Sequence, residues 1–139
     1  MRTLAPGDVA VGVELPRLDI PITATLIVAG ALASRDFQDV HHDATLARQR
    51  GAGDIFMNIL TTNGLVGRFV TDWAGPEAIL RSVSIRLGSP NYPGDVMQLT
   101  GNVTSVDGGD VEVAIRGATG LGEHVSGTVR LTLPGKGSE

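Results

Sequence analysis

The sequence has no cysteine, few aromatic residues and no cluster of basic residues. Without cysteine the chain cannot form a disulfide, a thiolate metal site or a cysteine nucleophile, and this composition fits a reducing cytoplasm. Eleven Lys and Arg residues stand against fifteen Asp and Glu residues, for a formal net charge of -4. Nucleic-acid binding requires a basic stripe, so we expect no nucleic-acid partner.

Long apolar stretches are missing as well. The longest one spans residues 26–33, includes Gly30 and is too short to cross a bilayer. Residues 1–13 contain one Arg and no continuous apolar stretch, which is unlike a signal peptide. We therefore expect a cytoplasmic protein without a membrane partner.

What the sequence does contain is enough aliphatic residues for one core. Its 139 residues suit a single domain, and 42% of them are hydrophobic. Because only three Phe, one Tyr and one Trp are present, this core must consist mainly of Val, Ile, Leu and Ala. We expect one domain over residues 1–134 and a flexible tail over 135–139. A chain this small often completes its burial against another subunit.

Two helices are predicted from capping residues and hydrophobic spacing. Thr23 or Thr25 can cap a helix through residues 26–33. A longer helix is predicted over residues 54–73, with Asp54 as its N-cap and apolar residues three, four or seven positions apart. It would be about 30 Å long, so we expect it to run through the middle of the domain.

The second half of the chain has the period of two that is typical of strands. Four strands are predicted, around residues 83–87, 97–103, 111–115 and 125–133. Short Gly-, Asn- and Pro-rich turns separate them, which favours antiparallel neighbours in a meander. The first twenty residues are predicted to be loop or a short edge strand. The pattern predicts an α+β fold in which an antiparallel sheet wraps around the long helix.

Most of the candidate chemistry lies in one segment, residues 34–43, which holds three carboxylates and two of the three histidines. Within it, Asp36 and His41 are five positions apart. On a continuous helix they would point about 140° away from each other. They can meet only if the helix ends near Asp36 and the chain turns back. A carboxylate beside an imidazole then supplies a base and an acid that both work near neutral pH.

Two other interpretations of this segment stay open. Spacing alone favours a structural one, in which Asp36 caps a helix or pairs with Arg35 and His41 is a partly buried loop residue. A metal site is the second, and its potential ligands would be Asp39, His41, His42 and Asp43. Adjacent imidazoles point in different directions and no distant cluster completes the set, so we predict no metal site and a solvent-facing His42.

Residues 33–43 resemble the hydratase motif of the MaoC-like family, in which an Asp is followed five residues later by a His. The usual setting is Asp-Phe-Asn-Pro-x-His-x-Asp, and here Gln38 and Asp39 replace Asn-Pro. Residues 54–61 resemble the start of the family's central helix, although Asn58 stands where a Gly is common. The resemblance covers almost the whole chain and implies a single hot-dog fold.

A narrower resemblance joins residues 35–43 and 54–56 with residues 70–76, which include Trp73-Ala74-Gly75-Pro76. Together they are similar to the small subunits of actinobacterial steroid side-chain hydratases, which are assembled from two different MaoC-like chains. This implies an enoyl-CoA hydratase subunit acting on a steroid enoyl-CoA in cholesterol breakdown. It also implies a heterotetramer with a second MaoC-like subunit, and a thiolase-like aldolase of the same pathway as a further partner. No cofactor is implied, since coenzyme A is part of the substrate.

The resemblance assigns roles to five residues. Asp36 and His41 are the implied catalytic pair. The backbone N–H of Asn58 or of a neighbour is expected to face the thioester carbonyl. Phe56 is expected to line an apolar channel, with Ile59 or residues of a partner as alternatives. Thr62 stands near the position where many hot-dog enzymes place a Ser, and we expect it to contact the substrate.

Two alternative functions are weighed beside the hydratase. A non-catalytic partner subunit would not need both members of the Asp-His pair. A hot-dog thioesterase would use a carboxylate on the central helix, but no Asp or Glu lies between Asp54 and Asp72. Trp73 is expected to anchor the core or an interface rather than to stack on adenine.

Overall fold

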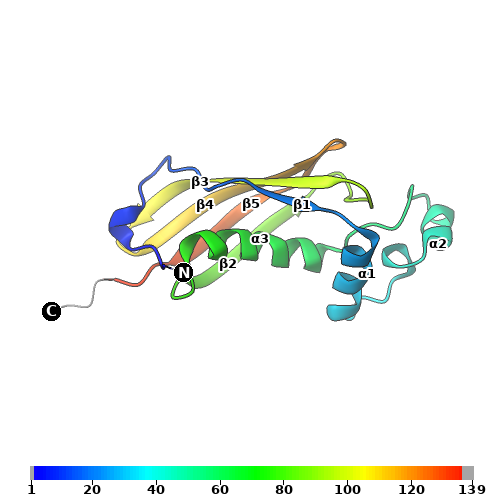
Figure 1. The fold of residues 1–139 in the computed structure, drawn as a ribbon, viewed down its shortest axis with the longest axis horizontal. Coiled ribbons are helices and arrows are strands. Elements are labelled where there is room, and N and C mark those ends of the chain that lie inside the picture. Colours follow the sequence, from blue (N-terminus) through cyan, green and yellow to red (C-terminus); the bar gives the residue numbers. More distant parts are fainter. Residues whose placement is uncertain (1, 136–139) are drawn as a thin grey trace.

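The structure, a computed structural model, describes residues 2–135 (Figure 1). Its elements in chain order are β1 (Leu18–Pro21), α1 (Ala24–Ala33), α2 (Ala44–Gln49), α3 (Ile59–Ala74), β2 (Ile79–Leu87), β3 (Val96–Asp107), β4 (Asp110–Thr119) and β5 (Gly122–Thr132). Short 3₁₀ turns cover Pro6–Asp8 and Asp39–His41. Apart from Gly135, the predicted tail over 135–139 lies outside the described residues.

The strands form one antiparallel sheet in the order β1-β3-β4-β5-β2. Strands β3, β4 and β5 form the predicted meander, and β1 is the short edge strand allowed for near residue 20. The predicted pairing of the first two strands of the meander is wrong, because β2 pairs with β5 at the far edge. The connection over residues 88–95 runs from the edge strand β2 to β3, which lies next to the opposite edge of the sheet. Alternating hydrophobicity specifies a strand's faces but not its neighbours.

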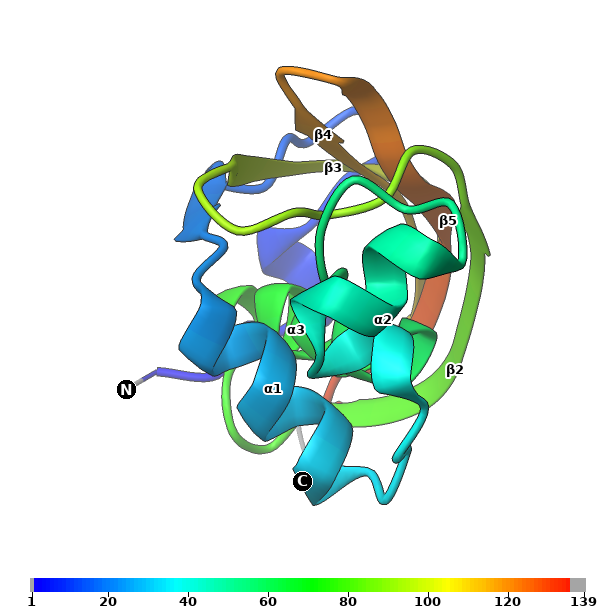
Figure 2. The same cartoon turned by 90° about the vertical axis from the view of Figure 1, so that its right-hand side faces the viewer.

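Helix α3 lies along the concave face of this sheet, while α1 and α2 lie beyond one end of it (Figure 1). Seen from that end, the sheet curves around α3 (Figure 2). The buried face of α3 includes Val66, Phe69 and Val70, which join the aliphatic side chains of β3, β4 and β5 in one core. Trp73 is half-buried and packs against the same core. The predicted α+β hot-dog architecture is confirmed.

Capping explains where two of the helices begin. The hydroxyl of Thr23 accepts the N–H of Leu26 at 3.0 Å, which confirms the predicted start of α1. The expected start of α3 is wrong, because its N-cap is Asn58, whose Oδ1 accepts the N–H of Thr61 at 3.0 Å. The Asp54 carboxylate accepts the N–H of Ile55 instead. With 16 residues, α3 is therefore about 24 Å long.

Helix α2 was not expected from the sequence, because six residues are too few to show a helical period. Asp43 caps it by accepting the N–H of Leu46 at 3.0 Å, and Ala47 on its inner face is fully buried. Within residues 2–135 no helix is both long and apolar enough to cross a membrane.

Candidate active site

The chain reverses direction at the end of α1 and so turns Asp36 back toward the domain. The N–H of Asp36 donates to the carbonyl of Ala31 at 2.9 Å, and that of Arg35 to the carbonyl of Leu32 at 3.1 Å. These two bonds form a Schellman motif. Arg35 takes the left-handed conformation of this motif, with φ 55°, where Gly is the usual residue. The condition for Asp36 to meet His41 is therefore satisfied.

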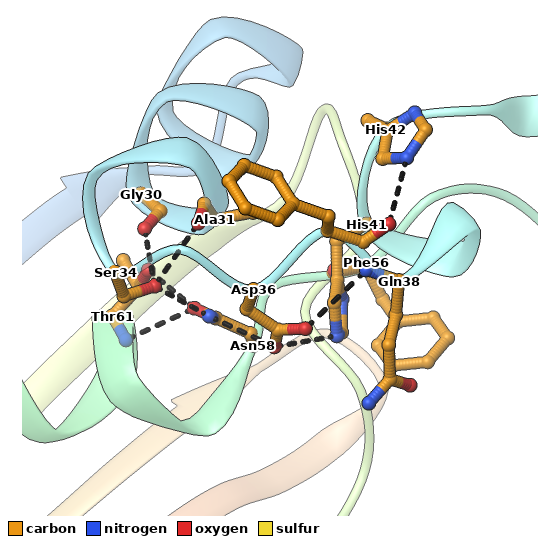
Figure 3. Close-up of polar contacts among 11 residues, drawn as sticks. Gly30, Ala31, Ser34, Asp36, Gln38, His41, His42, Phe56, Asn58 and Thr61 are labelled. Atoms are coloured by element: carbon orange, nitrogen blue, oxygen red, sulfur yellow. Dashed lines mark hydrogen bonds and ion pairs between the residues drawn. The ribbon is translucent and has the colours of Figure 1, made fainter.

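His41 lies in the 3₁₀ turn that follows and is held by two contacts (Figure 3). Its Nδ1 lies 2.7 Å from the carbonyl oxygen of Phe56, and its Nε2 lies 3.3 Å from Oδ2 of Asp36. A carbonyl oxygen only accepts, so Nδ1 carries a hydrogen and Nε2 faces the carboxylate. One proton between Nε2 and Oδ2 gives either an imidazolium–carboxylate pair or a neutral acid beside a neutral imidazole. The two residues are thus placed to exchange a proton.

Asn58 holds this pair to the start of α3. Its Nδ2 donates to Oδ2 of Asp36 at 3.1 Å and to the hydroxyl of Ser34 at 2.9 Å. Its Oδ1 accepts from both the N–H and the hydroxyl of Thr61, at 3.0 and 2.5 Å. Asn58 is only 2% exposed. The same side chain therefore caps the helix and orients the carboxylate.

A pocket of about 300 Å³ opens beside the pair. It is lined by Asp36, Gln38, His41, Phe56, Met57, Asn58, Ile59, Leu87, Gly88, Pro90 and His124. A larger hollow of about 550 Å³ lies on the outer face of the sheet, where Arg130 and Glu112 already form an ion pair. The smaller pocket is the candidate active site, because it combines the carboxylate–imidazole pair with the start of a helix and apolar walls.

Comparison with known proteins identifies the family of this chain. A family model described as MaoC like domain matches residues 10–124. The chain belongs to the MaoC-like family. It is 50% identical over 123 residues, 88% of this chain and 95% of the relative, to the 3-oxo-4,17-pregnadiene-20-carboxyl-CoA hydratase beta subunit of Mycobacterium tuberculosis.

Solved structures agree with this membership. A chain of the ChsH1–ChsH2 complex from Mycobacterium tuberculosis matches with a TM-score of 0.88 and 50% identity, over 90% of this chain and 98% of that one. The R-hydratase PhaJ1 from Pseudomonas aeruginosa matches with a TM-score of 0.88 and 20% identity, over 96% and 88% of the two chains. At that identity the second match shows the fold alone.

In this MaoC-like chain, Thr62 does not lie where the sequence analysis expects it. It is fully buried and is not among the residues that line the pocket. Its hydroxyl lies 2.8 Å from Nε2 of His124 instead. Phe56 does line the pocket, and its ring meets the His41 ring edge-on with centroids 5.1 Å apart.

Of the titratable residues that line the pocket, His124 is the one that the sequence analysis missed. Strand alternation groups Val125 with Val129 and Leu131 on the inner face, which assigns His124 to the outer face. A register shift between β4 and β5 at Gly117 disrupts this alternation, and both His124 and Val125 are buried. Burial lowers the pKa of His124, and its hydrogen bond to the Ser89 carbonyl partly opposes this effect.

The metal ligands considered from the sequence are engaged in separate contacts. Asp39 forms an ion pair with Arg50 at 2.7 Å, and this guanidinium lowers the pKa of the carboxyl group. Asp43 caps α2, and the exposed His42 contacts the Phe37 carbonyl. Among residues 2–135 no three His, Asp or Glu side chains are grouped in a way that could hold a metal ion.

Proposed function

We propose that this chain is an enoyl-CoA hydratase subunit that adds water across the α,β double bond of a thioester. The observation that carries the proposal is the 3.3 Å approach of His41 Nε2 to Asp36 Oδ2 at the pocket. A carboxylate and an imidazole that share one proton can take a proton from water and return one to carbon. The family and the hydratase named among its relatives support this chemistry.

In the proposed reaction, a water molecule bound at the pair attacks the β-carbon. Its oxygen forms the new C–O bond while one of its O–H bonds breaks, and Asp36 takes that proton. The π electrons of the double bond move toward the thioester, and the α-carbon receives a proton from the pair through His41. The proton on Oδ2 of Asp36 then moves to Nε2 of His41, which restores the imidazolium–carboxylate pair from which the reaction began. No separate cofactor is needed in this scheme, since coenzyme A belongs to the substrate.

Negative charge develops on the thioester oxygen during this addition. The first N–H groups of a helix have no partner within the helix, and its N-terminus carries a partial positive charge. Asn58 and Ile59, at the start of α3, line the pocket. We place the thioester carbonyl against their backbone N–H groups, where preorganised donors stabilise the enolate.

For the substrate, we propose a steroid side-chain enoyl-CoA. The support is the 50% identity to a subunit whose name specifies a pregnadiene carboxyl-CoA. A pocket of about 300 Å³ is too small for a ring system together with the thioester. Ile59 and Leu87 line it and are themselves 50% and 36% exposed, so its apolar wall continues onto the surface.

That surface also suits the second subunit. Strand β2 is an edge strand, and the large apolar side chains around it and the start of α3 are exposed. They are Ile59, Leu60, Ile79, Leu80 and Leu87. The relative is named a beta subunit and occurs in a two-component complex. We infer that a second MaoC-like subunit covers this surface and extends the channel, in a heterotetramer of two chains of each kind. A thiolase-like aldolase partner and a cytoplasmic location stay predictions.

Neither alternative function is favoured by the site. In the described chain, the one acidic residue of α3 is Asp72 near its far end, where it is 55% exposed and paired with Arg68. A thioesterase would need such a group near the pocket. A purely structural subunit would not require the contacts that hold Asp36 against His41.

The test is co-purification with a MaoC-like partner, followed by an ultraviolet assay of enoyl-CoA hydration. We expect Asp36→Asn and His41→Gln each to lower kcat by about 10²- to 10⁴-fold with assembly intact. His42→Gln is the matched control, because His42 is exposed and does not line this pocket. Turnover that survives both changes would move the chemistry to the partner subunit.

A further inference from the structure

His124 lines the pocket and joins three segments of the chain around it. It lies on β5 and is 1% exposed. Its Nδ1 lies 2.7 Å from the carbonyl oxygen of Ser89, in the connection after β2, and its Nε2 lies 2.8 Å from the hydroxyl of Thr62 on α3. The Ser89 carbonyl can only accept, so Nδ1 carries the hydrogen. In the neutral ring Nε2 then accepts the Thr62 O–H.

This arrangement decides what His124 can do. Both ring nitrogens are engaged with protein atoms, so neither is available to transfer a proton to a bound substrate. The lowered pKa of the buried ring agrees with a neutral state. Although the ring lines the pocket, its nitrogens can influence the reaction only through Thr62 or Ser89.

Thr62 belongs to the first turn of α3, and its N–H donates to the carbonyl of Asn58 at 3.3 Å. The neighbouring Thr61 holds the same turn on the other side, through Asn58 and Asp36. The turn is thus tied to the Asp36–His41 pair on one side and to β5 through His124 on the other.

We propose that His124 is a positioning residue for hydration, which accepts the Thr62 hydroxyl and so fixes the first turn of α3 at the thioester carbonyl. The inference rests on the proposed hydratase function. A neutral imidazole suits this role, because its Nε2 is a single acceptor with a fixed direction. The hydrogen bond from Nδ1 to the Ser89 carbonyl keeps the ring from rotating. Loss of the hydrogen bond between Thr62 and His124 would shift the first turn of α3 slightly. That shift would misplace the backbone N–H donors that act in the transition state.

Four variants separate the two hydrogen bonds. In His124→Asn the side-chain amide lies near the position of Nδ1 and can still donate to the Ser89 carbonyl. In His124→Gln the amide lies near the position of Nε2 and can still accept from the Thr62 hydroxyl. Thr62→Val removes the hydroxyl, and Thr62→Ser keeps it. Each is made in the complex with the partner subunit and assayed with crotonyl-CoA and with 3-oxo-4,17-pregnadiene-20-carboxyl-CoA.

We expect His124→Asn and Thr62→Val to lower kcat by about 10- to 100-fold and to change KM by less than about threefold. His124→Gln and Thr62→Ser should recover most of that loss. The double variant His124→Asn/Thr62→Val should be no slower than the single variants, because both remove the same contact. Melting temperature and assembled fraction are measured in parallel.

Parent-like turnover in His124→Asn and Thr62→Val would overturn the assignment. So would activity that falls only in proportion to the assembled fraction, with no recovery in the Gln and Ser variants. If the parent complex itself hydrates neither substrate, the proposed function fails and the role of His124 fails with it. Active parent enzyme with unaffected variants rejects the role of His124 alone.

Discussion

The Asp36 carboxylate accepts the side-chain amide of Asn58 at 3.1 Å, across 22 positions of sequence. The other end of that amide caps α3. The orientation of the carboxylate is therefore tied to the start of the helix, and one side chain serves both stability and the proposed chemistry.

Asn58 variants should separate these two roles. Asn58→Ala removes both and should destabilise the chain by more than about 1 kcal/mol, the usual value of an N-cap alone. Asn58→Ser keeps a cap but loses the donor to Asp36. We expect its melting temperature to stay close to that of the parent while kcat falls about tenfold. Equal activity in the Ser variant and the parent would show that Asp36 is oriented without Asn58.

Gly30 permits α1 to approach α3 closely. A Cβ atom at this position would collide with the side chain of Thr61, which is hydrogen-bonded to Asn58. We expect Gly30→Ala to destabilise the chain by about 1–3 kcal/mol and to lower hydration together with it. Gly64→Ala is the control, because a Cβ there meets nothing within 4 Å. Because Gly64 is an exposed helical residue, Gly64→Ala should raise the free energy of unfolding by up to about 1 kcal/mol. A Gly30→Ala variant as stable as the parent would contradict the close approach.

Arg35 occupies a left-handed position, which costs an L-residue about 1–2 kcal/mol. Arg35→Gly should therefore raise the free energy of unfolding by less than about 1 kcal/mol, since added freedom in the unfolded chain offsets part of the gain. Arg35→Val should lower it, because a branched Cβ fits this conformation poorly. Chemical unfolding of both variants checks the order, and a Val variant more stable than the Gly variant would disprove it.

The buried His124 should make stability depend on pH. Its pKa in the folded chain is lowered from the ordinary value of 6.5, so the folded state binds this proton more weakly than the unfolded state. The contribution of neutral His124 to the free energy of unfolding is complete above pH 6.5. It is lost as the pH falls below that value toward the pKa of His124 in the folded chain. The loss cannot exceed about 1.4 kcal/mol per pH unit.

Comparison with His124→Asn isolates this effect. The other titratable groups around the ring, Asp36 and His41 across the pocket and Glu123 paired with Arg116, are present in both proteins. We expect unfolding free energies measured between about pH 5 and 7.5 to decline toward acid more steeply in the parent than in the variant. Parallel curves would mean that His124 titrates normally.

Much of the fold could be predicted because it depends on local periodicity. The period of two marked the four long strands, and Thr23 marked the start of α1. The long helix was placed correctly in the middle of the domain but began too early, since Asp54 and Asn58 are both acceptable caps. Packing and the contact with Asp36 favour Asn58.

The sequence by itself determined the α+β class through its hydrophobic period, and it indicated the family and the candidate Asp36–His41 pair through its resemblance to a short motif. All of these are local properties of the chain. Only the tertiary structure decided that β2 lies beside β5, that Asn58 orients Asp36 and that His124 joins the pocket. Each of these depends on contacts between distant residues, such as Thr62 and His124. A local pattern shows which face a residue occupies, while its partner across the core is set by how the whole chain packs.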